Sequence, residues 1–289
     1  MFWRTSFPGR GAAAMAVLLL AGCAGDPLVG AVRADRGATT ASAHAGQVEA
    51  VMRVAARTAE SGDWATAASL YRRAHALDTT RLAPLLGLGD SLARLGAQDE
   101  AAQAYRAALA LAPEDVTALR GLGNALVALD EPTLAIPHLE RALDRADDPR
   151  LYKSLGVAYD MQGDHAAAQA YYRTGLNVAP GDVGLLNNLG LSLALSGDHR
   201  EAISLLERVV ATPTAGSRQR QNLALAYGLA GHMEEAAQVA RRDLDEQAVR
   251  NNLAYYETLR ALNAKDAARA LGSRSGAAFD TGAPTGAGE

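Results

Sequence analysis

The chain has 289 residues, of which 49% are hydrophobic and 21% charged, and its formal net charge is −4. This is the composition of a globular protein, and the mildly acidic balance gives no electrostatic reason to expect nucleic acid as a partner. The single cysteine, Cys23, excludes an internal disulfide framework and a cysteine-built zinc site. Aromatic residues make up only 5%, while alanine and leucine are abundant, which favours packed helices over sheets.

The N-terminal segment has the pattern of an export signal. Residues 1–10 contain Arg4 and Arg10 and no acidic residue, and residues 11–21 are all apolar or glycine. A basic start followed by a short apolar core is typical of a secretory signal peptide, which we place at residues 1–22. The alternative is a membrane-spanning anchor. It needs about 20 apolar residues, and the uncharged run here is much shorter.

The segment Leu20-Ala21-Gly22-Cys23 resembles the lipobox of bacterial lipoproteins. The resemblance implies that Cys23 carries the lipid, becomes the mature N-terminus and anchors the protein in a membrane. The next residue is Ala24, not the aspartate that commonly retains such proteins in the inner membrane, so the resemblance implies a periplasm-facing outer-membrane location. The alternative is a free cysteine that follows a signal sequence. Residues 23–47 are rich in small residues and are expected to form a flexible tether.

A repeat of about 34 residues follows. Its clearest marker is the residue between the two predicted helices of each unit. In chain order these residues are Gly62, Gly96, Asp130, Gly163, Gly197 and Gly231. Glycine there can adopt the left-handed conformation that ends a helix. Five residues after each marker comes an alanine: Ala67, Ala101, Ala135, Ala168, Ala202 and Ala236. An aspartate that could cap the second helix follows three of the glycines: Asp63, Asp164 and Asp198. The six units cover about 48–81, 82–115, 116–148, 149–182, 183–216 and 217–250.

These units resemble the tetratricopeptide repeat (TPR), a helix-turn-helix unit. The resemblance implies an all-α fold, a right-handed α-solenoid of about six TPR repeats over residues 48–250. Pro137 should kink the second helix of the third unit, so we expect the array to be least regular there. Residues 245–262 predict a further helix with one apolar face, and we assign a C-terminal capping helix to residues 251–271. Residues 272–289 have almost no large apolar groups and are predicted to be disordered.

The sequence contains no recognisable catalytic, cofactor or metal motif. The six histidines form no metal-binding pair, and His165 and His199 occupy the same inter-helix position in successive units. There is no G-x-S-x-G and no phosphate-binding loop, and Gly121-Leu122-Gly123 falls inside a predicted helix with no strand before it. We therefore expect no enzyme activity, no cofactor and no bound metal.

The repeat provides a concave face lined by the first helix of each unit. On it we place Arg120, Asn124, Lys153, Asp160, Asn187, Leu191, Leu195, Gln221, Leu225 and Leu229. Arg120 and Asn124 partly resemble the carboxylate clamp of some TPR domains, although Ser154 and Gly184 occupy other clamp positions; a simply solvated polar face is the alternative. The leucines are expected to be exposed, which would indicate a partner or a covering segment of the same chain.

Residues 220–256 resemble the C-terminal repeats of the tight-adherence (Flp) pilus assembly lipoprotein, TadD type. The similar features are Gln221–Ala226, Asp243–Asp245 and Asn251–Tyr255. The resemblance implies a role in type IVb pilus assembly as a pilotin-like factor, with an outer-membrane secretin or another pilus-assembly component as its protein partner. The alternative is a general periplasmic adaptor scaffold for envelope proteases or cell-wall enzymes.

Overall fold

The computed structural model describes residues 45–262. The chain divides into two compact units, Met1–Gly46 and Gln47–Glu289, and the fold described below belongs to the second. The predicted signal peptide, Cys23 and the tail over residues 272–289 lie outside the described residues.

Helices connected by short turns account for nearly all of the described residues, and no strand occurs within 45–262. After helical residues 45–60 come α2 (Trp64–Leu77), α3 (Leu82–Arg94), α4 (Gln98–Leu111), α5 (Val116–Ala128), α6 (Pro132–Leu143), α7 (Pro149–Gln162), α8 (His165–Val178), α9 (Val183–Ser196), α10 (His199–Val210), α11 (Ser217–Ala230), α12 (Met233–Ala240) and α13 (Glu246–Arg260). The all-α solenoid of six helix pairs and a closing helix is confirmed. No helix in this part of the chain is long and apolar enough to cross a bilayer.

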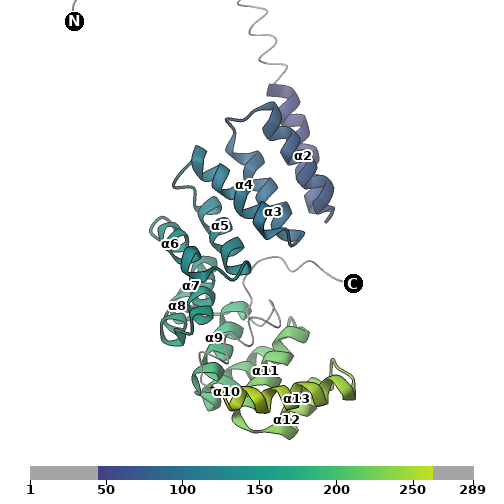
Figure 1. The fold of residues 1–289 in the computed structure, drawn as a ribbon, viewed down its shortest axis with the longest axis vertical. Helices are drawn as coiled ribbons and strands as arrows, with labels where there is room; N and C mark the ends of the chain where they lie inside the picture. The colour runs from purple at the N-terminus through teal and green to yellow at the C-terminus, as the bar shows by residue number, and fades with distance from the viewer. Residues whose placement is uncertain (1–44, 263–289) are drawn as a thin grey trace, which may run out of the picture. The chain divides into compact units, whose positions relative to one another are not determined.

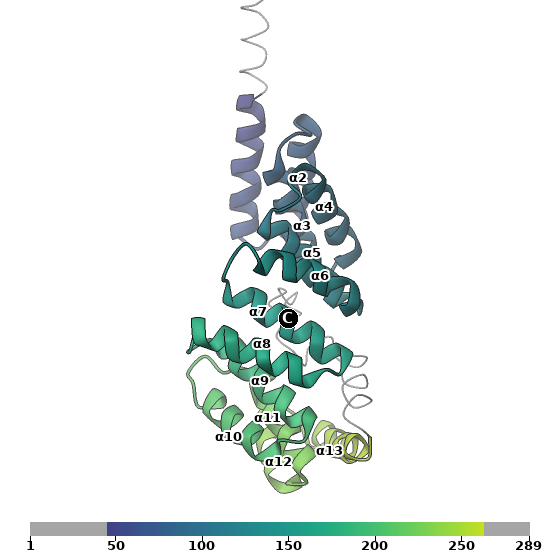
Figure 2. The same cartoon turned by 90° about the vertical axis from the view of Figure 1, so that its left-hand side faces the viewer.

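The helices stack in chain order from residues 47–60 to α13 (Figures 1 and 2). From α3 on, each odd-numbered helix contacts its sequence neighbours and also the next odd-numbered helix. In the part of the chain that the structure describes, the backbones of the even-numbered helices do not pack against one another, although ion pairs join Arg72 of α2 to Glu100 of α4 and Arg173 of α8 to Glu201 of α10. The odd-numbered helices therefore form the tighter, inner layer, as the first helices of TPR units are expected to. Helix α13 packs on α11 and α12 and closes the stack.

The inter-helix markers behave as their sequence spacing predicts. The five glycines have φ between +78° and +96°: Gly62, Gly96, Gly163, Gly197 and Gly231. Asp130 fills the remaining slot at φ +61° and is the only non-glycine residue with positive φ among those described. Asp63 and Asp164 accept hydrogen bonds from the backbone N–H groups of Thr66 and Ala167 at 3.1 and 3.0 Å. Asp198 makes no such capping bond, so that prediction is wrong; its carboxylate accepts a hydrogen bond from Ser196 instead.

The core lies between the two layers. The alanines of the second helices, which the repeat singles out, are all completely buried: Ala67, Ala101, Ala135, Ala168, Ala202 and Ala236. Each lies where a second helix packs closely on its neighbours, so a larger side chain would cost about 1–3 kcal/mol by overpacking. These small residues set the close spacing on which the groove described below depends.

The expected irregularity at Pro137 does not appear as a break in the helix, and the predicted kink stays a prediction. Helix α6 runs unbroken through Pro137. The shortest of the helices α2 to α13 is α12, with 8 residues. Pro137 lies early in α6, where proline removes one backbone hydrogen bond but its neighbours still have helical partners. The side chain of Pro137 is exposed, so its ring does not disturb the core.

Candidate protein-binding groove

The groove side of the inner layer is built from equivalent positions of the first helices. The sixth residue of these helices is Gly87, Gly121, Ser154, Asn188 and Asn222 in α3, α5, α7, α9 and α11. The ninth residue of the same helices is Asp90, Asn124, Val157, Leu191 and Leu225. Along the array the sixth position thus grows in size, and the ninth changes from polar to apolar.

A cavity of about 380 Å³ opens at the N-terminal end of this series, between α2, α3, α4 and α5. Two tyrosines of the second helices, Tyr71 and Tyr105, line it together with the two glycines of the sixth position. A Cβ added to Gly87 would lie 2.5 Å from the Tyr71 ring, and one added to Gly121 would overlap the Tyr105 ring. Glycine at these positions is therefore required for the rings to lie against the inner helices. We call this cavity the front pocket.

The charges of the front pocket are predominantly positive. Arg94, Arg120 and Arg150 line it with a single carboxylate, Asp90. Arg94 lies over the Trp64 ring, 5.0 Å from its centroid, which is a cation–π contact. Such a pocket suits an acidic or carboxylate-bearing segment of another protein.

Arg120 makes no hydrogen bond or ion pair within residues 45–262, whereas Arg150 is paired with Asp148 at 2.7 Å and Arg94 lies over the Trp64 ring. The only acid of the pocket, Asp90, already accepts a hydrogen bond from the Tyr105 hydroxyl at 2.6 Å. Burial and the nearby Asp90 charge raise the pKa of Tyr105, so its hydroxyl stays a donor. The guanidinium of Arg120 is thus free to bind a partner's carboxylate.

The predicted groove residues separate into two groups. Arg120 and Asn124 both line the front pocket, and both are half-buried. Lys153 is half-buried on α7 and is not part of the pocket lining. The repeat pattern did not by itself indicate the aromatic part of the pocket, Tyr71 and Tyr105. The two tyrosines are 34 residues apart, and so are the two groove-side glycines that they pack against. This shared spacing is the signal that could have indicated the pocket.

The leucines of the C-terminal units are not exposed, so that expectation is wrong. The exposed fractions of the side chains are 0% for Leu191, 5% for Leu195 and Leu225, and 8% for Leu229. We use the name rear groove for the groove-side positions of these four residues and Asn187, which the structure buries; Leu195 and Leu229 line a cavity of about 260 Å³ there. Whether it binds a partner stays a prediction.

Amide side chains link the inner helices along the rear groove. Asn222 donates to Asn187 at 3.1 Å, which joins α11 to α9, and Asn187 donates to Asn188 at 3.2 Å. Gln221 accepts a hydrogen bond from Asn252 of α13 at 3.5 Å. Asn187 is completely buried and Gln221 half-buried. These amides hold successive repeats together, a role that their groove-side spacing did not indicate.

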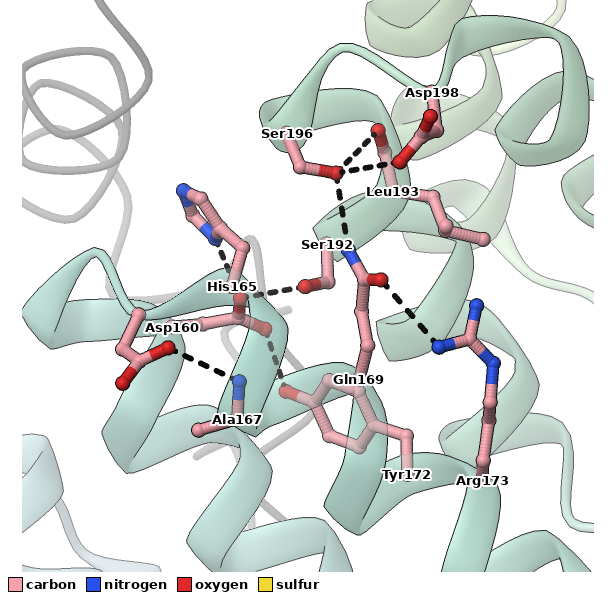
Figure 3. A network of polar contacts seen from close by, with 11 residues as sticks. Asp160, His165, Ala167, Gln169, Tyr172, Arg173, Ser192, Leu193, Ser196 and Asp198 are labelled. Atoms are coloured by element: carbon pink, nitrogen blue, oxygen red, sulfur yellow. Dashed lines mark hydrogen bonds and ion pairs between the residues drawn. The ribbon is translucent and has the colours of Figure 1, made fainter.

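Asp160 marks the join between the two parts of the groove (Figure 3). The sequence places it on the concave face, but the structure buries it completely. Its carboxylate contacts the His165 ring at Nδ1 (2.7 Å) and accepts from the hydroxyls of Tyr172 (2.9 Å) and Ser192 (2.6 Å). Burial raises the pKa of Asp160, against the opposing effect of these hydrogen bonds. The hydroxyl of Ser192 donates to the carboxylate, so this bond ties α9 to α7.

No group of three or more His, Cys, Asp or Glu side chains within residues 45–262 could hold a metal ion. The front pocket places cations, tyrosines and an amide on one face of the repeat array.

Four overlapping stretches of the chain match a family model described as tetratricopeptide repeat: residues 58–116, 86–150, 120–182 and 153–218. Together they cover more than half of the sequence. No curated protein matches the chain.

Solved structures share the fold. PilW, described as a widely conserved type IV pilus biogenesis factor, aligns with a TM-score of 0.60 at 18% identity, over 68% of this chain and 89% of PilW. The pilF protein of Pseudomonas aeruginosa aligns with a TM-score of 0.57 at 16% identity, over 68% and 90%. A tetratricopeptide repeat protein from Parabacteroides merdae aligns with a TM-score of 0.60 at 15% identity, over 73% and 84%. At these identities the similarity shows the fold alone. The chain belongs to the tetratricopeptide-repeat family and is a protein-binding scaffold.

Proposed function

We propose that this protein is a lipid-anchored TPR factor of Flp/Tad (type IVb) pilus assembly that acts as a pilotin-like partner of the outer-membrane secretin. The observation that carries the binding part is the front pocket, an accessible cavity whose Arg120 has no carboxylate partner among the described residues. The resemblance of residues 220–256 to the TadD type and the description of PilW as a pilus biogenesis factor support the pilus context.

The proposed mechanism is mechanical. The lipid on Cys23 holds the array at the outer membrane, and the front pocket binds an acidic segment of a secretin subunit until the subunits assemble. Binding at Arg120 would be a charge-assisted hydrogen bond, which is geometrically specific because guanidinium and carboxylate can pair through two parallel bonds. Asn124, one helical turn further along α5, can donate to the same segment.

Affinity isolation of the full chain from outer membranes tests the partner. We expect the secretin to be recovered with the natural sequence and to fall at least tenfold with Arg120→Glu. The matched control is Arg106→Glu, an equal charge change at an exposed position of the outer helix α4. Recovery of envelope proteases or cell-wall enzymes without a secretin would overturn the pilus assignment. Equal recovery with both variants would overturn the front pocket as the binding site.

Fractionation of cells that produce Cys23→Ser tests the anchor. Because the lipid would be attached through the thiol, we expect this variant to leave the outer-membrane fraction while its helical circular dichroism stays unchanged. The stable binding expected of multiple acyl chains, each contributing about 0.8 kcal/mol per buried methylene, would be lost. Retention of Cys23→Ser in the outer membrane would contradict the lipoprotein assignment.

A further inference from the structure

A second cavity, of about 260 Å³, lies between the turn that joins α9 to α10 and the C-terminal ends of α11 and α13. Leu195, Leu229 and Leu259 supply apolar wall, and His199 and Arg260 supply its ionisable groups. We call this cavity the end pocket. It shares no lining residue with the front pocket, so it is a separate candidate site.

The histidine of the end pocket lacks a partner that the equivalent histidine of the fourth unit has. His165 and His199 are the first residues of α8 and α10, and Nδ1 of His165 contacts the Asp160 carboxylate at 2.7 Å. Asp160 is the twelfth residue of α7, and the twelfth residue of α9 is Ala194, which lines the end pocket. Nδ1 of His199 is buried and has no hydrogen-bond partner among the described residues. The end pocket thus lacks the carboxylate that the fourth unit supplies from its own chain.

Arg260 adds a positive charge that no carboxylate neutralises. It makes no hydrogen bond or ion pair in the part of the chain that the structure describes. A Cβ built on Gly231 would lie 3.2 Å from Nη2 of Arg260, so the guanidinium lies against the turn between α11 and α12. Burial lowers the pKa of His199, the Arg260 charge adds to this effect, and the Asp198 charge opposes it. The neutral ring can carry a proton on Nδ1 and donate it in a hydrogen bond.

We propose that the end pocket binds the free C-terminus of a partner polypeptide that ends in an apolar residue. Arg260 pairs with the α-carboxylate, for which a guanidinium can form two parallel hydrogen bonds, and His199 donates to the same group. The terminal side chain then contacts Leu195 and Leu229, which line the cavity.

The small size of the end pocket favours a chain terminus over an internal acidic residue. Its volume is below the roughly 300 Å³ at which ordinary small-molecule sites begin. The α-carboxylate and the side chain of a terminal residue leave the same Cα atom, so both can enter a cavity of this size. An internal aspartate or glutamate brings a chain on both sides and carries no apolar group beside its carboxylate. A polypeptide is the expected occupant because the chain belongs to a protein-binding repeat family.

Calorimetry on the full-length protein tests the contact with the carboxylate. The probe is a short peptide without acidic side chains that ends in leucine, compared with the same peptide amidated at its C-terminus. We expect the amide to bind at least tenfold more weakly, and Arg260→Gln to weaken the free acid by a similar factor with unchanged helical circular dichroism. The matched control is Arg250→Gln, an exposed arginine of the same helix outside the pocket, which should leave the affinity within twofold. Equal binding of acid and amide would overturn the proposal.

Two further outcomes separate the end pocket from other sites. Arg120→Glu should leave the affinity for this peptide unchanged; a loss with Arg120→Glu but not with Arg260→Gln would place the peptide in the front pocket and overturn the proposal. N-acetyl-leucine should bind at least tenfold more weakly than the peptide. Equal binding of the two would assign the pocket to a small carboxylic acid and would also overturn it.

Ala194→Asp tests the comparison with the fourth unit. The introduced carboxylate stands at the position equivalent to Asp160, so it should contact His199 and exclude the ligand. We expect at least a tenfold loss of peptide affinity, whereas Ala211→Asp, a change at the exposed C-cap of α10, should cause none. Unchanged binding to a folded Ala194→Asp variant would show that His199 does not contact the ligand and would contradict the proposal. If this variant does not fold, the result with Arg260→Gln decides.

Discussion

The front pocket and the rear groove are built from the same helix positions, yet one is open and charged while the other is closed and apolar. Gly87 and Gly121 leave space that tyrosine rings line, whereas Asn188 and Asn222 at the same position carry amides, and the amide of Asn222 links α11 to α9. The repeat therefore fixes the backbone, while two or three side chains in each unit decide whether the concave face of that unit is open to a partner.

The largest expected effect concerns the join between the two parts. Asp160→Ala would leave the hydroxyls of Tyr172 and Ser192 without their buried acceptor, so we expect a loss of about 3 kcal/mol in the free energy of unfolding. Urea denaturation measures it. The control is Asp164→Ala, which removes an exposed helix cap and should cost about 1 kcal/mol. Equal losses for the two variants would show that burial of Asp160 is unimportant.

A smaller effect is expected at the floor of the front pocket. In Gly121→Ala the new methyl group must displace the Tyr105 ring, which should cost about 1–3 kcal/mol. Denaturation in urea is again the measurement. Gly181→Ala is the matched control because no atom lies within 4 Å of its added Cβ, and it should change stability little. A neutral Gly121→Ala would mean that the Tyr105 ring is not fixed by the glycine.

The turn between α5 and α6 offers a stabilising change. Asp130 has a left-handed backbone conformation that costs energy for a residue with a side chain, so Asp130→Gly should stabilise the protein by about 0.5 kcal/mol. In the neighbouring unit, Gly163→Ala adds a side chain at the equivalent left-handed position and should destabilise the protein by about 1 kcal/mol. Thermal unfolding of the pair checks both signs; a destabilised Asp130→Gly would indicate that the carboxylate has a role of its own.

The smallest expected effect is a pH dependence in the rear half. Arg220 donates to both carboxylate oxygens of Asp243, at 2.7 and 2.5 Å, and these hydrogen bonds lower the pKa of Asp243. A carboxyl group with a lowered folded pKa stabilises the fold above its unfolded pKa, which is about 3.9, and that contribution disappears as the pH falls through the folded value.

Asp243→Asn should therefore flatten the loss of stability between about pH 5 and pH 2. Denaturation midpoints at several pH values measure the slope. Asp144→Asn, which removes an exposed carboxylate without an ion pair within residues 45–262, is the control and should leave the slope unchanged. Parallel curves for the natural protein and Asp243→Asn would contradict the prediction.

The fold could be predicted from the sequence because each unit repeats the same local requirements. Glycine at Gly62 or Gly197 and alanine at Ala67 or Ala202 are needed wherever a turn or a close helix contact recurs, so the spacing alone indicates the helix pairs. The concave-face position of Arg120 and Asn124 could likewise be predicted, because equivalent positions of the first helices recur in every unit.

The closed rear groove could not be predicted from the same spacing. Periodicity places Leu191 and Leu225 on the concave face, but it does not tell whether that face is covered. The hydrogen bonds of Asp160 depend on His165 and Tyr172 of α8 and on Ser192 of α9, a combination that occurs once along the described array and leaves no periodic signal.

That combination also affects how the array can unfold. In a repeat protein each unit is stabilised mainly by its neighbours, so unfolding can start at an end and advance one unit at a time, as in a one-dimensional chain of coupled spins. The carboxylate of Asp160 bonds to α8 and α9 as well as lying on α7, so it couples the fourth and fifth units more strongly than apolar contact alone. A fraying front that advances from the N-terminal units would pause at this point, leaving α7 to α13 folded as a cooperative block.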